Sequence, residues 1–280
     1  MTPRGRHDRR AALAALALCA GAASPVTEAA RISPERAVTP PQLPLVALDE
    51  LPPLMVFDKL PPSGRGKLSA AEVAAIEAAH GLPSAFDARD TWPGCVGEVR
   101  NQGQCGSCWA FAATETLADR WCIATNGAEK VVLSPQNLMN CETLNLGCTM
   151  GSLPQWAWSF LESHGVLSEA CVRYEAHTEL HCAKECPTQA DTRHYHATNV
   201  THLAPLLHPE EHVADIMRAV MSGPVDATFN VYADFGPYWQ FASTEVPAYG
   251  RVYKKKGGSY KGLHSVKVVG WGTDEKEGCV

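Results

Sequence analysis

Apolar residues recur at helical spacing in the middle of the chain. The strongest pattern covers residues 107–126, where every fourth position is apolar and Gly127 supplies a helix end. A second helix is predicted from Pro135, because Ser134 is a good N-cap and proline suits the first helical position. A third is predicted over residues 154–164. This part of the chain is therefore expected to be helical.

The pattern changes further along the chain. A helix with one apolar face is predicted over residues 209–221, and residues 225–231 then alternate between apolar and polar as a half-buried strand does. Val266 and Val268 alternate again after His264. A helical part followed by a β-rich part predicts an α+β fold of two lobes, and a site is expected in the cleft between them.

The first 81 residues are patterned differently. Four arginines precede an apolar run at residues 11–20, and the run is followed by small residues, so residues 1–23 are predicted to be a secretory signal peptide. An organelle-transit or amphipathic helix is the alternative; a membrane span would need about 20 apolar residues. Residues 24–81 are rich in Pro and Ala, with one helical stretch at 69–80. They are expected to be a propeptide or a linker.

Composition and charge narrow the class of protein. The 280 residues are 45% hydrophobic, enough for a substantial core, and the net charge of −6 contains no long block of one sign. Neither a nucleic-acid partner nor a membrane surface is indicated. Eleven cysteines are many for a cytosolic enzyme, and the odd number leaves at least one thiol outside any disulfide framework.

The run from Gln102 to Phe111 contains the candidate chemistry. Cys108 falls at the start of the long predicted helix, where unpaired N–H groups and the helix dipole favour a thiolate, the nucleophilic form of cysteine. Gly106 permits close approach of a substrate to the backbone. The side-chain amide of Gln102 could be directed at a developing oxyanion.

Two other interpretations of the cysteines remain open on the residues alone. Cys105 and Cys108 have the spacing of a redox pair, although no strand of a βαβ unit precedes them. The same pair could bind zinc together with a second group, which would have to come from Cys182, Cys186, His194 and His196. Their irregular spacing and the secretory context favour disulfides, and neither a metal nor a cofactor is expected.

Residues 102–111 resemble the nucleophile segment of the papain-like cysteine peptidases, which carry the signature C-G-[SA]-C-[WY]. Further segments resemble the same family in the same order, and their residues are most similar to those of its cathepsin B branch. These segments are residues 82–89, 92–95, 133–136, 222–225, 231–235 and 270–272. The resemblance implies a two-lobed papain-like fold over residues 82–280, with a helical lobe at about 82–190 and a β lobe at about 191–280.

The resemblance also implies a mechanism. Cys108 would be the nucleophile, and His264, in a segment similar to the family's histidine strand, would take its proton and later protonate the leaving amine. Gln102 is also expected to take part in catalysis, through its side-chain amide. The substrate-binding positions implied in this way are Gly106, Ser107, Trp109, Gly151, Leu153 and Ser265.

The remaining cysteines can be paired by the same resemblance. Four bridges are implied: Cys95–Cys122, Cys105–Cys148, Cys141–Cys182 and Cys171–Cys186. Cys19 would leave with the signal peptide, and Cys279 would stay unpaired.

The chain also departs from the family pattern. An orienting asparagine is expected about 20 residues after the histidine, near position 284, but no asparagine follows Asn230. The right lobe is therefore expected to be incomplete at its C-terminal end, and the sequence to be a fragment or a truncated gene model. Met150 replaces a glycine beside Gly151, so pairing with a substrate is expected to shift.

A secreted or lysosomal cysteine peptidase is the leading functional hypothesis. The stretch between Cys171 and Cys182 contains His177 and His181 but is too short for a long occluding loop, so endopeptidase activity is predicted. Expected partners are peptide or protein substrates, the propeptide and cystatin-like inhibitors, bound by a monomer. Asn199 begins a glycosylation sequon, which suits secretion. The alternatives are a catalytically silent papain-fold protein with a binding or matrix role, or an inactive fragment.

Overall fold

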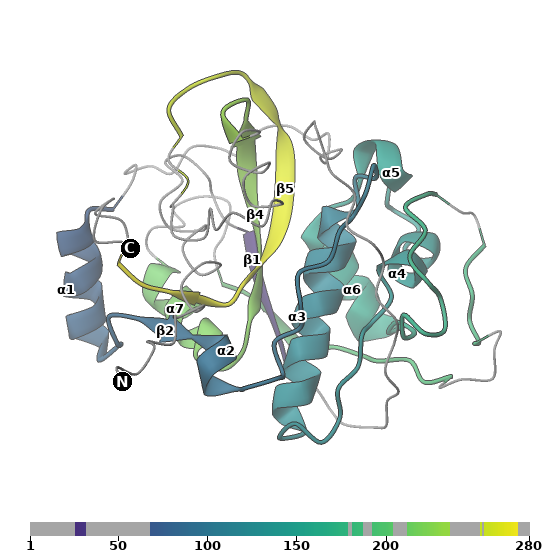
Figure 1. Ribbon diagram of the computed structural model, residues 1–280, viewed down its shortest axis with the longest axis horizontal. Helices are drawn as coiled ribbons and strands as arrows, with labels where there is room; N and C mark the ends of the chain where they lie inside the picture. Colours follow the sequence, from purple (N-terminus) through teal and green to yellow (C-terminus); the bar gives the residue numbers. More distant parts are fainter. Residues whose placement is uncertain are drawn as a thin grey trace, which may run out of the picture.

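The computed structural model describes residues 26–31, 68–178, 181–186, 192–203, 212–235, 253 and 255–273. Within these ranges, a group of helices lies beside an antiparallel sheet (Figure 1). The predicted signal peptide, Cys19 and Cys279 lie outside the described residues.

The helical layer is built around α3 (Cys108–Ala124), with α4 (Pro135–Cys141), α5 (Gly147–Met150) and α6 (Pro154–Ser163) beside it (Figure 1). Their apolar faces share one core, which includes Trp109, Leu117, Leu138, Trp158 and Leu161. Each is buried to at least 99%, so the one-face spacing seen in the sequence corresponds to a real interior.

The helix ends follow local chemistry. The hydroxyl of Ser134 accepts a hydrogen bond from the Asn137 amide, which is the predicted N-cap of α4. The long helix α3 ends at Ala124, two residues before the predicted end. Asn126 and Gly127 have φ values of 51° and 78°, so the chain has already entered the left-handed region that ends helices.

The sheet has the strand order β3-β1-β4-β5 and contains β1 (Val26–Arg31), β3 (Thr198–His202), β4 (Val225–Tyr232) and β5 (Tyr260–Val268). Each neighbouring pair is antiparallel. The pairing of β4 with β5 is the longest, running from Val225 opposite Val268 to Tyr232 opposite Tyr260. β5 therefore begins before His264, which lies inside the strand.

The prediction that residues 225–231 form a half-buried strand is wrong, because all eight residues of β4 are buried. On one face, Asp226 accepts a hydrogen bond from Trp158 of α6. On the other, Val225 packs in a second core with Val213 and Met217 of α7 (Val213–Val220). Because both faces are covered, the polar positions of the alternation are interior positions.

Residues 24–81, predicted as a propeptide, contribute two described elements to this half of the molecule. β1 lies inside the sheet between β3 and β4. α1 (Ala70–His80) begins with a capping box between Ser69 and Glu72, and its Val73 packs in the core that α7 also enters. The side of the β layer away from α3 is therefore covered partly by this segment (Figure 1).

Two short strands that are far apart in the sequence, near residues 86 and 271, lie side by side. β2 (Phe86–Asp87), which leads into the short α2 (Ala88–Thr91), pairs with β6 (Gly270–Trp271). The rings of Phe86 and Trp271 stack with centroids 5.3 Å apart. The Trp271 indole donates to the Pro83 carbonyl at 3.1 Å.

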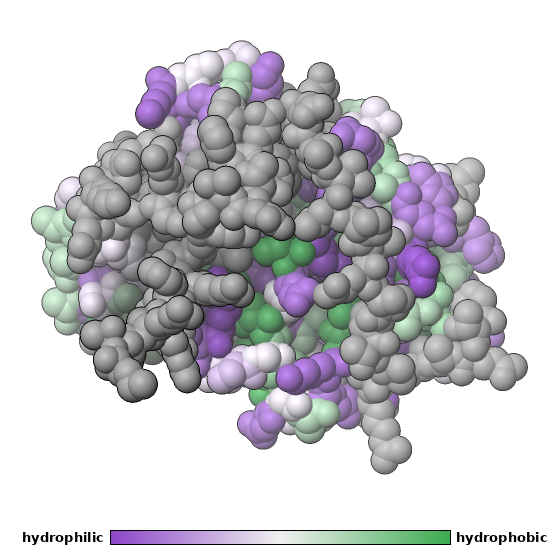
Figure 2. Space-filling view, viewed as in Figure 1, coloured by the Kyte–Doolittle hydropathy of each residue, from purple (hydrophilic) through white to green (hydrophobic). Residues whose placement is uncertain are grey.

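Charged side chains of α3 fasten the helical layer to the β layer. Arg120 donates to the carbonyls of Pro224, Gly223 and Ala219, at 2.6, 2.8 and 3.0 Å. Lys267 of β5 reaches back to α3, with its Nζ 2.6 Å from Asp119. On the face of the molecule drawn in Figure 2, hydrophobic side chains lie between polar ones near the centre, so apolar packing accompanies these polar contacts. The two layers are thus joined by directional polar contacts that fix their relative position.

We predict that Arg120→Met lowers the free energy of unfolding by about 3 kcal/mol, because three acceptor carbonyls lose their donor while they stay away from water. Urea unfolding monitored by tryptophan fluorescence measures this. Arg218→Met is the matched control, since Arg218 lies on an exposed face of α7 and its ion pair with Asp215 is solvated. Equal losses in the two variants would contradict a fastening role for Arg120.

Candidate active site

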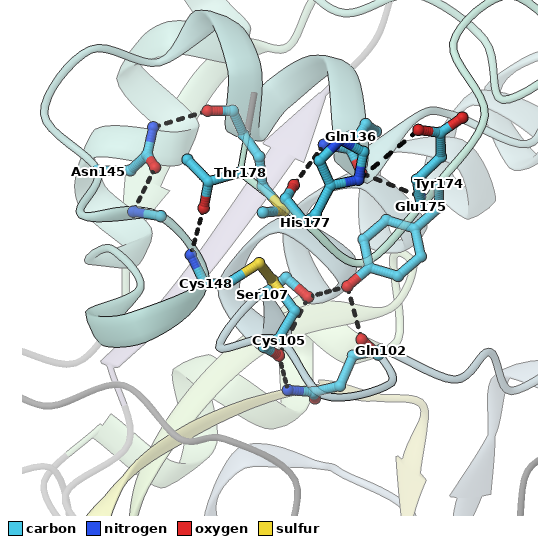
Figure 3. The surroundings of a disulfide bond; sticks show 12 residues. Gln102, Cys105, Ser107, Gln136, Asn145, Cys148, Tyr174, Glu175, His177 and Thr178 are labelled. Atoms are coloured by element: carbon cyan, nitrogen blue, oxygen red, sulfur yellow. Dashed lines mark hydrogen bonds and ion pairs between the residues drawn. A yellow bond between two sulfur atoms is a disulfide. The ribbon is translucent and has the colours of Figure 1, made fainter. Parts of the chain in front are cut away.

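A tight loop, residues 102–107, leads into α3 and ends at Cys108, the first residue of that helix. Two donors converge on the carbonyl of Cys105, the Gln102 side-chain amide at 2.7 Å and the Ser107 backbone amide at 2.8 Å. The Cys105–Cys148 disulfide ties the loop to α5, and Gly106 donates to the Cys148 carbonyl at 2.8 Å (Figure 3). The entry to α3 is therefore held from several directions.

The Cys108 thiol is buried, with 2% of the residue exposed. Burial raises its pKa to about 12, and the negative charge of Asp226 adds to that rise. The backbone N–H groups of Ser265 and Trp109 hydrogen-bond to the sulfur and oppose it. In this structure the loss of hydration outweighs the N–H groups that favour a thiolate, so the thiol is neutral, and the thiolate–imidazolium pair stays a prediction.

The hydrogen bond from Ser265 shows how the fold brings distant parts of the chain together. Ser265 lies on β5, next to His264 and 157 residues after Cys108, and the strand passes the start of α3 at this point. Side chains alternate along a strand, so His264 lies on the side of its cross-strand partner Phe229 and Ser265 on the side of Thr228. The imidazole packs edge-on to the Phe229 ring at 5.8 Å.

Burial also governs the charge of His264. The residue is 3% exposed, and burial lowers the pKa of its imidazole to about 4. At neutral pH the thiol of Cys108 and the imidazole of His264 are both uncharged in this structure. An ion pair between them needs water or a polar substrate to reach the site.

Two further buried groups near this place were missed by the sequence analysis. Asp226 of β4 is fully buried, accepts from the Trp158 indole at 2.9 Å, and has a pKa raised to about 7 by burial. Tyr174 is 4% exposed, and its hydroxyl contacts both Gln102 and Ser107. The sequence signal for Asp226 was its place in an alternating strand, where a solvent-facing residue was expected; nothing local marked Tyr174.

The substrate-binding positions differ in how well their environments suit that role. Trp109 is 0% exposed inside the helical core, and its contact with a substrate stays a prediction. Ser107 is also fully buried. Ser265 is 4% exposed, and its hydroxyl oxygen lies 2.6 Å from the hydroxyl oxygen of Thr228. Leu153 is half-buried at the start of α6.

Gly151 was expected to pair with a substrate through its backbone. In the structure its N–H donates to Gly147 at 2.9 Å, and its carbonyl accepts from Leu146 at 2.8 Å, so both groups are engaged within the turn of α5. Gly151 has φ 74° and ψ −150°, a conformation that favours glycine. Here it serves the turn; Met150 beside it is 37% exposed.

The structure contains the four disulfides that the resemblance implied: Cys95–Cys122, Cys105–Cys148, Cys141–Cys182 and Cys171–Cys186. Cys105 is therefore not a redox partner of Cys108, which is the one free cysteine in the described part of the chain. Cys182 and Cys186 are likewise bonded elsewhere. Within the described ranges, no group of three or more His, Cys, Asp or Glu could hold a metal ion.

Two peripheral predictions fall on surface residues. Asn199 lies exposed on β3, so its side chain is open to solvent, and its glycosylation stays a prediction. His177 is exposed, and its Nδ1 lies 3.6 Å from Glu175. Of the helices that the structure describes, none has the length and apolarity to cross a bilayer.

Comparison with known proteins agrees with this geometry. Residues 82–279 match the model of the papain family cysteine proteases. The chain is 34% identical over 198 residues to a cathepsin B-like protein, CP2, of Giardia intestinalis, covering 69% of this chain and 61% of that protein. It is 33% identical over 207 residues to cathepsin B of Dictyostelium discoideum, covering 69% and 62%. The chain thus spans a little over three-fifths of the length of these relatives.

Solved structures with the same fold include a procathepsin B from Trypanosoma congolense, with a TM-score of 0.50 and 25% identity over 69% of this chain and 63% of that one. The ragweed pollen allergen Amb a 11, a cysteine protease in its proform, gives a TM-score of 0.53 and 28% identity over 69% and 52%. A cysteine protease of Carica candamarcensis bound to E-64 gives 0.51 and 27% over 68% and 78%. With a helix-borne free cysteine facing a histidine strand, and a family match over most of its length, this chain belongs to the papain family of cysteine proteases.

Proposed function

We propose that this chain forms the peptidase domain of a cathepsin B-like cysteine peptidase that hydrolyses peptide bonds through Cys108 and His264. The observation that carries the proposal is the free thiol of Cys108 at the start of α3, with the β5 backbone hydrogen-bonded to its sulfur one residue from His264. Because the chain belongs to the papain family of cysteine proteases, we interpret this cysteine and histidine as the nucleophile and the base of a peptidase.

The steps follow from the groups present. The imidazole of His264 takes the thiol proton, and the sulfur attacks the carbonyl carbon of the scissile peptide bond. The oxyanion is held by the backbone N–H of Cys108, one of the first N–H groups of α3, and by the side-chain amide of Gln102. The imidazolium then protonates the leaving amine, and water hydrolyses the thioester that remains.

The neutral thiol and imidazole describe a resting form. With a thiol pKa of about 12, the thiolate is about one part in 10⁵ at pH 7. We propose that residues 24–81 are a propeptide, whose β1 lies within the sheet and whose α1 packs beside α7, and that the chain is cut in the exposed link near Gly81. The proforms among the related structures support this reading.

The substrates we propose are peptides and proteins cut at internal bonds, without a cofactor. The segment after Cys171 is short, and its Tyr174 to Thr178 stretch packs on α4 and α5; Gln136, for example, donates to the His177 carbonyl. The binding of E-64 by a related protease supports sensitivity to E-64, and cystatin-like inhibitors are proposed as further partners. We propose a monomer routed through the secretory pathway to the exterior or to a lysosome.

The ionisation state predicts how Cys108 reacts. In the full chain, alkylation of Cys108 by iodoacetamide is expected to rise about tenfold per pH unit from pH 6 to pH 10, because the thiolate fraction grows tenfold per unit below the pKa. Mass spectrometry of the peptide containing Cys108 measures the rate. A plateau that begins below pH 5 would instead reveal a preformed thiolate–imidazolium pair.

Cleavage near Gly81 is expected to switch on peptidase activity together with stoichiometric labelling of Cys108 by E-64. Cys108→Ala and His264→Ala should each lower kcat/KM by about 10³-fold or more, since the nucleophile and the base act as a unit. His202→Ala, an exposed histidine on β3, is the matched control and should retain activity. Folded protein that neither cleaves nor takes up E-64 would favour the non-catalytic binding role, for which the neutral thiol and imidazole are the supporting observation.

Endopeptidase activity is tested with a pair of peptides that differ only in a free or an amidated C-terminus. We expect the two kcat/KM values to agree within about threefold, because no described cation is placed to select a terminal carboxylate, and His177 is already paired with Glu175. His177→Ala should leave the ratio unchanged. A tenfold preference for the free carboxylate that disappears in His177→Ala would show dipeptide removal instead.

A further inference from the structure

Tyr174 joins the two ends of the loop that leads into α3. Its hydroxyl donates to the Gln102 carbonyl at 2.6 Å and lies 2.5 Å from the Ser107 hydroxyl (Figure 3). A carbonyl only accepts, and a phenol has one hydrogen to give. The Ser107 hydroxyl therefore gives its hydrogen to Tyr174 at 2.5 Å in preference to the Cys105 carbonyl, which lies 3.4 Å away. A one-way hydrogen-bonded chain therefore runs from Ser107 through Tyr174 to Gln102.

The phenol keeps its proton over the working range of an enzyme. Burial raises the pKa of Tyr174 to about 12, and the neighbouring Ser107 hydroxyl only partly opposes this. The donor to Gln102 is therefore present at acidic and at neutral pH. At 4% exposure, water cannot easily replace it.

The tyrosine is itself held from both ends. Its backbone amide donates to Glu169 at 2.8 Å, and Glu169 pairs with Arg100 at 2.8 Å. Its ring packs edge-on against Phe111 of α3, with centroids 4.6 Å apart. A residue fixed in this way can transmit its position to the loop.

Other bonds of the loop act at its middle, where Cys105 forms the disulfide to Cys148 and Gly106 donates to the Cys148 carbonyl. Between residues 102 and 107, the described hydrogen bonds of the Gln102 side chain and of the Ser107 amide both end on the Cys105 carbonyl, inside the loop. They fix its curvature. The link from one end of the loop to the other comes from Tyr174, which is 67 residues away from Ser107 in the sequence.

We propose that Tyr174 is a positioning residue, which holds residues 102–107 so that the Gln102 amide and the Cys108 backbone N–H point to one oxyanion position. This rests on the proposed peptidase function. Tyr174 touches neither the thiol proton nor the substrate in the proposed steps. Its contribution falls on the step in which negative charge develops on the carbonyl oxygen.

Tyr174→Phe removes the hydroxyl and keeps the ring against Phe111. We expect kcat to fall by about 10- to 100-fold with KM changed less than about threefold, because a misdirected oxyanion donor costs up to about 10²–10³ in rate. A peptide aldehyde, whose adduct with Cys108 places an oxygen at the same position, should bind weaker by a similar factor. Alkylation of Cys108 by iodoacetamide forms no oxyanion and should stay within twofold.

Ser107→Ala tests the other half of the chain and provides a second variant if Tyr174→Phe is poorly folded. The kcat of the double variant Tyr174→Phe/Ser107→Ala should be at most about twofold below that of the less active single variant, since both substitutions break the same link. Tyr195→Phe is the matched control: Tyr195 is fully buried in the same core but packs on Trp121, near the far end of α3. It should leave kcat and aldehyde affinity unchanged.

Amide hydrogen exchange separates this inference from the proposed function. Residues 102–107 should exchange at least about tenfold faster in Tyr174→Phe and in Ser107→Ala than in Tyr195→Phe. Unchanged exchange, or faster exchange with unchanged aldehyde affinity in an active enzyme, overturns the positioning role. If wild-type protein neither cleaves peptides nor binds the aldehyde, the proposed function fails, while the exchange rates still decide whether Tyr174 holds the loop.

Discussion

The contact between the start of α3 and the middle of β5 is the constraint on which the rest of the molecule depends. Here the sulfur of Cys108 receives a hydrogen bond from the backbone of Ser265, so the two halves of the chain meet at an atomic contact. Further along, Lys267 of β5 pairs with Asp119 of α3, and Arg120 of α3 donates to the carbonyls of Gly223 and Pro224 in the turn before β4. Because these bonds are directional, they fix how the helix lies along the strand as well as their separation.

Burial at this contact sets the chemistry as strongly as the identity of the residues does. A cysteine at a helix start has N–H groups that favour its thiolate, yet the Cys108 pKa rises because the sulfur has lost its hydration. The same cause lowers the pKa of His264 and raises that of Asp226. Each group is driven towards its uncharged form. A change in access to water would therefore alter all three charges together.

The loop before α3 shows a second kind of constraint, in which covalent and hydrogen bonds act on one short segment. The Cys105–Cys148 disulfide anchors it to α5, and the Tyr174 hydroxyl joins its two ends. A catalytic loop benefits from such support, because donors held in place need no reorganisation when charge develops. The support comes from residues far away in the sequence, and so it depends on the packing of the whole helical layer.

The sequence by itself determined the local elements, since caps and apolar spacing act over a few residues: α4 begins after Ser134, and α6 begins at Pro154. It also predicted Cys108 and His264 as the catalytic pair, because a family resemblance resides in short motifs. Only the tertiary structure decided that β4 is buried on both faces, that Trp109 belongs to the core, and that Tyr174 joins the loop. Burial and hydrogen bonding between distant segments depend on which surfaces meet, and local spacing contains no record of that.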